Sequence, residues 1–373
     1  IHYSIITISF KPSEQLKHEN KLRNMLFTFH YIIIQLFLFS TLLLASNQSR
    51  PQANDSFIIV KTIGAGNISI LSRRFFLKNN QIKVQLNNNT MNNSYQYYLN
   101  CSENQTNIFK IIFDNALNSI SWMFSGCNNI TEIDFSNFDT SNVDDMDSMF
   151  SGCSQLSSLD LSSFDTSKVE DMTYIFNDCS KLISLDLSNF NTKKTENMGF
   201  MFYKMESMTS LNISNFNTYN VGFMHYMFDG CKSLISLNLS HFNISKITSM
   251  DNMFSECNNL ISLIIDNFDT SSVKSMKYLF NGCKSLKEIN INNFNTSLVN
   301  SFAYMFSGCS SITSLNISKL DTSQVNTFEN LFSECSSLKS LDLSTFNTKN
   351  VENMAHMFKG CSNINYKIGR AHV

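Results

Sequence analysis

Apolar residues recur along most of the chain at a constant spacing of 26 residues. A phenylalanine followed three residues later by a cysteine marks each unit, and no insertion or deletion interrupts the series. A constant period predicts a stack of coils, because each unit alone cannot close a core and must bury its apolar face against its neighbours. The marking residues are Phe124, Phe150, Phe176, Phe202, Phe228, Phe254, Phe280, Phe306, Phe332 and Phe358.

Each unit contains two apolar patterns, which predict two kinds of element. The segment 156–161 reads Leu-x-x-Leu-x-Leu, and its closing alternation is typical of a strand with one buried face. The segment 169–176 is apolar at its first, fourth, seventh and eighth positions, which fits a short helix with an apolar stripe. We therefore predict an α/β repeat solenoid with leucine-rich-repeat-like coils of strand, turn and short helix.

Residues 57–119 precede the regular repeat and have a different pattern. Short runs rich in Ile, Val, Phe and Tyr are separated by glycine or asparagine clusters, which predicts β-hairpins. The last apolar positions of this region already fall on the repeat, so we expect an N-terminal β-rich cap that grades into the first coil. About nine coils then occupy residues 120–366. The expected cap strands are 57–63, 67–71, 81–86, 94–99 and 108–113.

The two ends of the chain carry patterns unlike the repeat. Residues 25–46 begin with methionine and contain an apolar run that ends in small residues, which predicts a secretory signal peptide; the alternative is an N-terminal membrane anchor. Residues 1–24 would then be an untranslated leader, and the polar residues 47–56 a linker. Residues 367–373 leave the repeat and resemble a translated sequencing adapter. We expect them to replace a missing C-terminus, where a membrane tether is one option.

Composition narrows the classes of function. The chain is 43% hydrophobic and contains only two prolines, which favours one long array over several globular domains. Charged residues make up 16% and the formal net charge is −2, so no basic stripe is expected that could neutralise a phosphate backbone. Nucleic acid is therefore not an expected partner.

The repeat resembles a known family of surface proteins. The unit 137–162, NFDTSNVDDMDSMFSGCSQLSSLDLS, is similar to the repeats of BspA-like leucine-rich repeat proteins, and the likeness covers about residues 120–364. The same repeats are known in mycoplasma-type lipoproteins and in many protists. The resemblance implies an extracellular or cell-surface protein that acts in adhesion or recognition, with no known enzymatic activity.

The cysteine of each unit has two explanations. Metal sites need clustered ligands, whereas each coil offers one thiol, so we predict no metal and no cofactor. Buried free thiols are the favoured hypothesis, and it is supported by Met205, an apolar residue that takes the cysteine position in one coil. Disulfides between adjacent coils are the alternative, because a coil spacing of about 4.8 Å lies within the Cα separation that a disulfide tolerates. The ladder comprises Cys127, Cys153, Cys179, Cys231, Cys257, Cys283, Cys309, Cys335 and Cys361.

A recurrent Asp/Asn-Thr step, as in Asp139-Thr140, raises the question of a calcium ladder. Asparagine replaces aspartate in about half of the coils, which removes the charge that a hard cation needs. Both residue types are also typical caps of tight turns. We therefore predict side-chain capping at this step and no calcium site.

Small polar residues at the outward strand positions form the candidate binding face, which is either a recognition strip or a plain solvated face. Ile264 breaks the polar pattern and is the better docking candidate. Glycans on the sequons at three of these positions, Asn212, Asn238 and Asn316, would cover the strip. The strip comprises Ser158, Asp160, Ser184, Asp186, Ser210, Asn212, Ser236, Asn238, Ser314 and Asn316.

No constellation of catalytic residues emerges from the sequence, and we expect a non-catalytic protein. The leading hypothesis is a secreted or surface-displayed recognition protein whose ligand is an unknown protein or glycan. The alternative is a coat or matrix component that associates with copies of itself.

Overall fold

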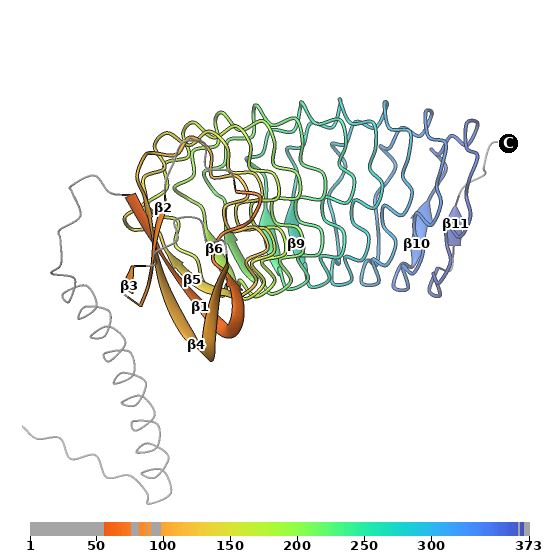
Figure 1. The fold of residues 1–373 in the computed structure, drawn as a ribbon. Helices are drawn as coiled ribbons and strands as arrows, with labels where there is room; N and C mark the ends of the chain where they lie inside the picture. Colours follow the sequence, from red (N-terminus) through yellow and green to blue (C-terminus); the bar gives the residue numbers. More distant parts are fainter. Residues whose placement is uncertain (1–55, 76–81, 88, 91–97, 365, 369–373) are drawn as a thin grey trace, which may run out of the picture. The chain divides into compact units, whose positions relative to one another are not determined.

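The computed structural model describes residues 56–75, 82–87, 89–90, 98–364 and 366–368. In these residues a β-sheet is followed by a long stack of coils (Figure 1). The predicted leader and signal peptide, the linker up to residue 55 and the tail from residue 369 lie outside the described residues.

A five-stranded antiparallel sheet forms the N-terminal part, with strand order β3-β2-β4-β1-β5. The expected strands 57–63 and 67–71 are one strand, because the chain passes Gly64 in a β-bulge, at a φ of 120°, and continues to pair with β4. β5 belongs to the first coil and pairs with β1, so backbone hydrogen bonds join this sheet to the coils. The strands are β1 (Ser56–Ser69), β2 (Ile82–Leu86), β3 (Asn89–Thr90), β4 (Tyr98–Phe113) and β5 (Ile130–Asp134).

Within the coil stack, short parallel strands pair with the strand one coil further along. Ser184 lies opposite Ser210, so the register equals one repeat of the sequence. Isolated bridges at a second position, such as that between Asp145 and Asp171, repeat the same register. The paired strands are β6 (Ser184–Asp186) with β7 (Ser210–Asn212), β8 (Ser236–Asn238) with β9 (Ser262–Ile264), and β10 (Ser340–Asp342) with β11 (Tyr366–Ile368).

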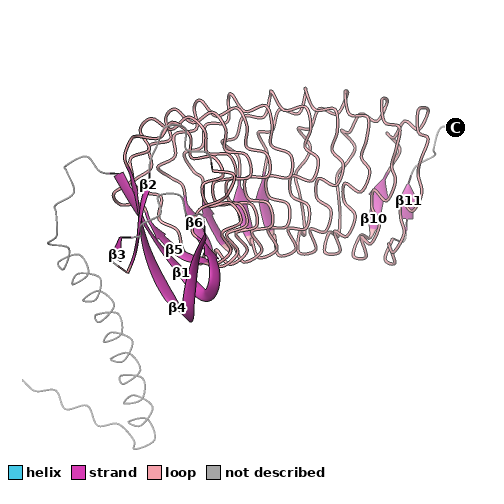
Figure 2. Ribbon diagram, viewed as in Figure 1, coloured by secondary structure: helices cyan, strands magenta, loops and turns pink. Residues whose placement is uncertain are grey.

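The predicted helix of each coil is wrong. The described residues contain strands, turns and loops but no helix, and therefore none that could cross a membrane (Figure 2). The N–H of Met149 bonds to the carbonyl of Met146 at 3.2 Å, whereas the N–H of Ser148 bonds to Thr173 in the next coil at 2.8 Å. In an α-helix every interior N–H would bond four residues back along the same segment. Here alternate donors leave the segment, so an α/β solenoid is replaced by stacked turns and short strands.

Left-handed residues make this alternation possible. Ser148 and Gly152 have φ values of 56° and 75°, and the equivalent two positions of the other coils are also left-handed. A left-handed residue reverses the course of the backbone between successive tight turns, so a continuous helix cannot form.

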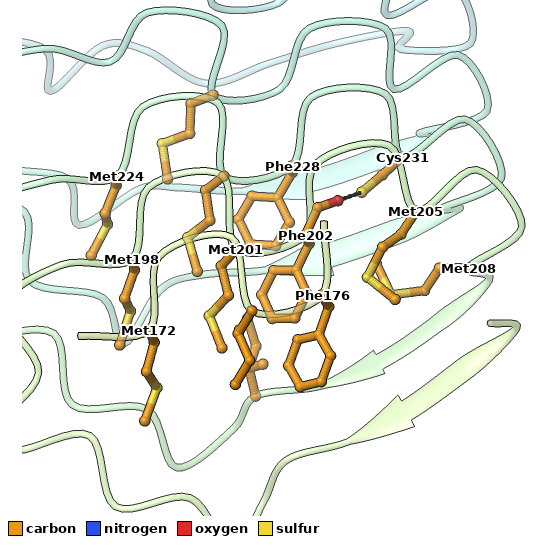
Figure 3. Close-up of a cluster of buried hydrophobic side chains, with 14 of the residues drawn as sticks. Met172, Phe176, Met198, Met201, Phe202, Met205, Met208, Met224, Phe228 and Cys231 are labelled. Carbon is orange, nitrogen blue, oxygen red and sulfur yellow. Dashed lines mark hydrogen bonds between the residues drawn. The ribbon is translucent and has the colours of Figure 1, made fainter. Parts of the chain in front are cut away.

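The core is built from columns of identical side chains. The marking phenylalanines, Phe124 to Phe358, stack ring on ring, with centroids 5.4–5.9 Å apart and planes within 22° of parallel. Figure 3 shows three of these rings beside a column formed by Met172, Met198 and Met224. Each aromatic pair adds about 0.5–1.5 kcal/mol beyond the burial of its area. The constant period is therefore required by packing, since an inserted residue would displace a ring from the stack.

Candidate functional site

The cysteine ladder lies in the core as free thiols, and the alternative of disulfides between coils is not formed. Each thiol from Cys153 onward donates a hydrogen bond to a phenylalanine carbonyl of the preceding coil, as from Cys231 Sγ to Phe202 O at 3.1 Å (Figure 3). Burial raises the pKa of Cys127 and of Cys335 to about 12. Burial therefore leaves little reactive thiolate at these two positions at neutral pH, and the buried members of the ladder are structural.

The Asp/Asn-Thr step caps a turn and links neighbouring coils. Asp139 Oδ1 accepts a hydrogen bond from the N–H of Ser141 at 2.9 Å, which lowers the pKa of Asp139. Buried Thr140 donates from Oγ1 to the carbonyl of Asp165 and accepts from the N–H of Asp165. Among the described residues no group of three histidines, cysteines or carboxylates is arranged to hold a metal ion.

The predicted strip lies on the surface. Its residues are exposed except for Asn212, which is half-buried. β6 and β7 bring Ser184 beside Ser210 and Asp186 beside Asn212, with Asn212 Nδ2 donating to Asp186 Oδ1 at 3.0 Å. Ser158, Asp160, Ser314 and Asn316 lie in coils that form no strand at this position.

The acidic and amide residues of the strip also cap a turn. Asp160 and Asp186 each accept a hydrogen bond from the N–H two residues later, at 2.9 Å. Hydrogen bonds from the backbone and side chain of Ser162 lower the pKa of Asp160, and those from the side chain and backbone of Ser188 lower the pKa of Asp186. Ile264 has no capping group and is 38% exposed. Ile235 and Ile261, in adjacent coils beside the strip, are each half-exposed, and the N–H of Ile261 bonds to the Ile235 carbonyl. The strip is thus a regular polar surface that Ile264 interrupts, and exposed isoleucines, Ile183 among them, lie beside it.

A second face, which the sequence reasoning missed, carries carboxylates in adjacent coils. Glu170 lies beside Asp144 of the preceding coil, because the Glu170 N–H bonds to the Asp144 carbonyl at 2.8 Å. Glu196 lies beside Glu170 in the same way, with its N–H 2.9 Å from the Glu170 carbonyl. Asp145 and Asp171 are bridged in the neighbouring column. Like charges in such register are unfavourable. We name this set, together with Asp147, the acidic half: Asp144, Asp145, Asp147, Glu170, Asp171 and Glu196.

An aromatic half continues the same columns. Phe223 follows Asp145, Asp171 and Asn197 in one column, where the other coils carry a polar cap; it is 56% exposed. Phe200 is stacked between Tyr174 and Tyr226, at centroid distances of 4.4 and 4.5 Å. Tyr203 and His225 stand perpendicular to Phe200, and His225 also contacts Phe223 edge to face. The aromatic half is Tyr174, Phe200, Tyr203, Phe223, His225 and Tyr226.

The two halves are electrostatically coupled. Burial, followed by the charges of Asp171 and Asp145, raises the pKa of Asp147, while hydrogen bonds from Ser148 and Trp122 oppose the rise. Burial and the charge of Asp147 raise the pKa of Tyr174. Burial lowers the pKa of His225, so the imidazole is neutral at pH 7. Because Asp145, Asp171 and Phe223 also lie in one column of bridged residues, the acidic and aromatic halves form one surface, the acid–aromatic face.

The coils coincide with a known protein family. Four overlapping stretches match the family model described as "Mycoplasma protein of unknown function, DUF285": residues 118–237, 184–289, 224–315 and 290–373. Together they run from residue 118 to residue 373, which is more than half of the chain. The chain belongs to this DUF285 family. No curated protein and no solved structure gives a match.

The DUF285 match begins where the coils begin, and the sheet strands β1 to β4 precede it. This match confirms that the repeats belong to a family of mycoplasma type, as the resemblance predicted. Within the DUF285 repeat, the acid–aromatic face has a signal in the sequence. Tyr174, Phe200 and Tyr226 each lie two residues before a marking phenylalanine, and Asp144, Glu170 and Glu196 recur at the same period.

Proposed function

We propose that this DUF285 chain is a non-catalytic recognition protein of the BspA-like type, secreted or displayed at the cell surface, which binds a protein or glycan through the outer surface of its coils. The observation that carries the proposal is the acid–aromatic face. Phe223 replaces a turn-capping polar residue by a large exposed ring, and three like-charged side chains stack in adjacent coils. Both features work against stability, and departures of this kind concentrate at functional sites.

The backbone beneath this face suits recognition. Tyr174, Phe200 and Tyr226 are half-buried and lie on coils whose phenylalanine rings are locked in the core stack, so these surface rings are held in place before a partner arrives. A preorganised aromatic surface loses little conformational entropy on binding, and aromatic residues are frequent anchors of interfaces. The resemblance to BspA-like surface proteins and the predicted signal peptide support a location outside the cell.

The test is a binding survey with the full chain. Immobilised protein is exposed to a glycan array and to a panel of extracellular matrix proteins, and sedimentation velocity is measured over a hundredfold concentration range. Saturable binding to a member of either panel by a monomeric protein supports recognition. Self-association with rising concentration and no binding would favour the coat or matrix alternative. Protease accessibility of the protein on intact cells tests its location.

A further inference from the structure

We infer that the partner is a protein with a basic segment, whose lysine or arginine side chains bind the acid–aromatic face. The inference rests on the proposed function, since it names the chemistry of the partner at that same surface. Charge, ring geometry and two contacts within the chain support it.

Charge complementarity is the first argument. The acidic half brings six carboxylates together over adjacent coils, and the ion pairs found in the described part of the chain involve none of them. Such a surface attracts cations over about 8–10 Å at physiological salt. Beyond Glu196 the column of Asp144 carries no acidic residue for five coils, Lys274 included, until Glu352, and Ser249 and Ser275 continue the column of Asp145. The negative charge is therefore local, as expected of a docking site.

The chain itself places cations on aromatic rings at this surface. The Arg74 guanidinium lies over the ring of Trp122, with Cζ 4.6 Å from the centroid. Trp122 occupies the same left-handed position of its coil as Tyr174, Phe200 and Tyr226 do of theirs. Lys204 Nζ lies 5.0 Å from the ring centroid of Tyr203, within the aromatic half. Cation–π contacts of this kind are stronger when the pair is partly desolvated.

The ring geometry favours a protein over a neutral glycan. Both faces of Phe200 are covered, by Tyr174 and Tyr226, so Phe200 presents its edge. Sugars that stack on aromatic residues need an open ring face, and a neutral sugar carries no positive charge to offset the repulsion among the carboxylates. An apolar side chain of a partner can instead contact the ring edges and the exposed Phe223, while its neighbours pair with the acids.

The spacing sets the size of the segment. The path from the coil of Asp145 to that of Phe223 crosses three coil steps, or about 14 Å at about 4.8 Å per step. An extended peptide rises about 3.3 Å per residue, so four or five residues span it. A segment with basic residues at one end and an apolar residue at the other matches the polarity of the face.

The experiment measures binding of a labelled probe peptide, Arg-Gly-Arg-Gly-Leu-Gly-Tyr, to the full-length protein by fluorescence anisotropy. A second peptide carries Glu in place of Arg. The charge variant is D144N/E170Q/E196Q, which keeps side-chain shape. The aromatic variant is Phe223→Ser, which restores the polar residue type of this column. The matched control is D160N/D186N on the strip, where asparagine can keep the turn cap.

We expect saturable binding of the arginine peptide that weakens at least tenfold between 50 and 200 mM salt, and no binding of the glutamate peptide. Both face variants should weaken binding about tenfold, the charge variant should also flatten the salt dependence, and the control should stay within twofold. Urea unfolding of each variant confirms that the fold is intact. If the variants destabilise the chain, the test is hydroxyl-radical footprinting of the unaltered protein. The arginine peptide should then protect the residues of the acid–aromatic face, and a lack of protection would overturn the inference.

Three outcomes of the binding measurements would overturn the inference: no binding of the arginine peptide, equal binding of the glutamate peptide, or unchanged binding by both face variants. The proposed function is judged separately by the survey. If the protein binds a glycan or matrix protein and the charge variant binds it equally well, recognition stands and the basic partner is wrong. If it binds neither panel and self-associates, the proposed function itself fails.

Discussion

At the scale of single residues, each thiol from Cys153 to Cys335 joins its coil to the backbone of the preceding coil. These cysteines are buried, as the Phe-x-x-Cys step predicts. That each thiol donates to a phenylalanine carbonyl of the preceding coil could not be read from the sequence, because it depends on how the coils are offset. The aromatic position at 174, 200 and 226 has a clear period, but only the structure shows that it faces outward.

The thiols should be protected from modification in the folded protein. Burial raises the pKa of the Cys127 and Cys335 thiols to about 12, so little thiolate exists at these positions at pH 8. We expect Cys361, the one half-buried cysteine, to react first with an aromatic disulfide reagent, and all ten to react in guanidinium. The measurement is a timed thiol count with mapping of the modified sites. Rapid modification of several ladder cysteines in the native protein would contradict it.

The same thiols should make the fold sensitive to alkali. Well below pH 9 the thiols are protonated in both the folded and the unfolded state, and they add no pH dependence to stability. Between pH 9, the unperturbed value, and pH 12 the unfolded chain loses thiol protons that the native state keeps, so stability falls as pH rises. Urea unfolding at pH 8, 9.5 and 10.5 measures this slope. C127A/C335A should have a shallower slope than the unaltered chain; an equal slope would refute the assignment.

The buried threonine column should contribute measurable stability. Thr192 Oγ1 donates to the Asn217 carbonyl at 3.0 Å and accepts from the Asn217 N–H at 2.7 Å. Thr192→Val keeps the shape and leaves both backbone groups without that partner, so we expect a loss of about 1–3 kcal/mol in urea unfolding. The control is the exposed Thr209→Val, expected to change stability by less than about 0.5 kcal/mol. Equal effects would show that the bonds contribute little.

At the scale of elements, the strand half of each coil was easier to predict than the other half. The alternation of Leu185 and Leu187 about a polar residue predicts a strand, and β6 forms there. The same alternation at Leu159 and Leu161 gives a segment that forms no strand. The apolar spacing of three and four residues in 169–176 fits a helix, but successive turns with hydrogen bonds three residues back place side chains inward at the same spacing. Inter-coil hydrogen bonds and left-handed residues decide between them, and neither is visible in a binary pattern.

Glycine in place of another residue at the second left-handed position of a coil, the position of Gly152, should stabilise that coil. Glu334 has a φ of 60°, whereas six coils carry glycine at this position. Glu334→Gly removes the steric cost of the left-handed conformation, and we expect a gain of up to about 1 kcal/mol. The control, Glu288→Gly, lies on an exposed position without a left-handed φ and should lose about 0.5–1 kcal/mol through backbone entropy. A loss of stability in both variants would show that Glu334 is not strained.

At the scale of the whole molecule, the stack is nearly one-dimensional. Each coil contacts its neighbours through the phenylalanine column, the thiol bonds and the parallel bridges, and every one of these contacts joins a coil to the one next to it. Stability should then be a sum of coil and interface contributions. The acid–aromatic face spans adjacent coils, so it needs the stack to exist but not its full length.

Removing one whole period should therefore leave a folded protein, whereas removing half a period should not. Deletion of residues 286–311 joins Ser285 to Ile312, which takes the place of Leu286 and restores every column. We expect a lower melting temperature and a urea m-value smaller by about a tenth, since m follows the surface exposed on unfolding. Deletion of residues 286–298 instead brings Val299 to the position of Leu286 and moves Phe306 out of the ring stack, so the coils beyond the junction should unfold. If both deletions are tolerated equally, the columns do not set the register; if the full-period deletion unfolds the protein, stability is not additive between coils.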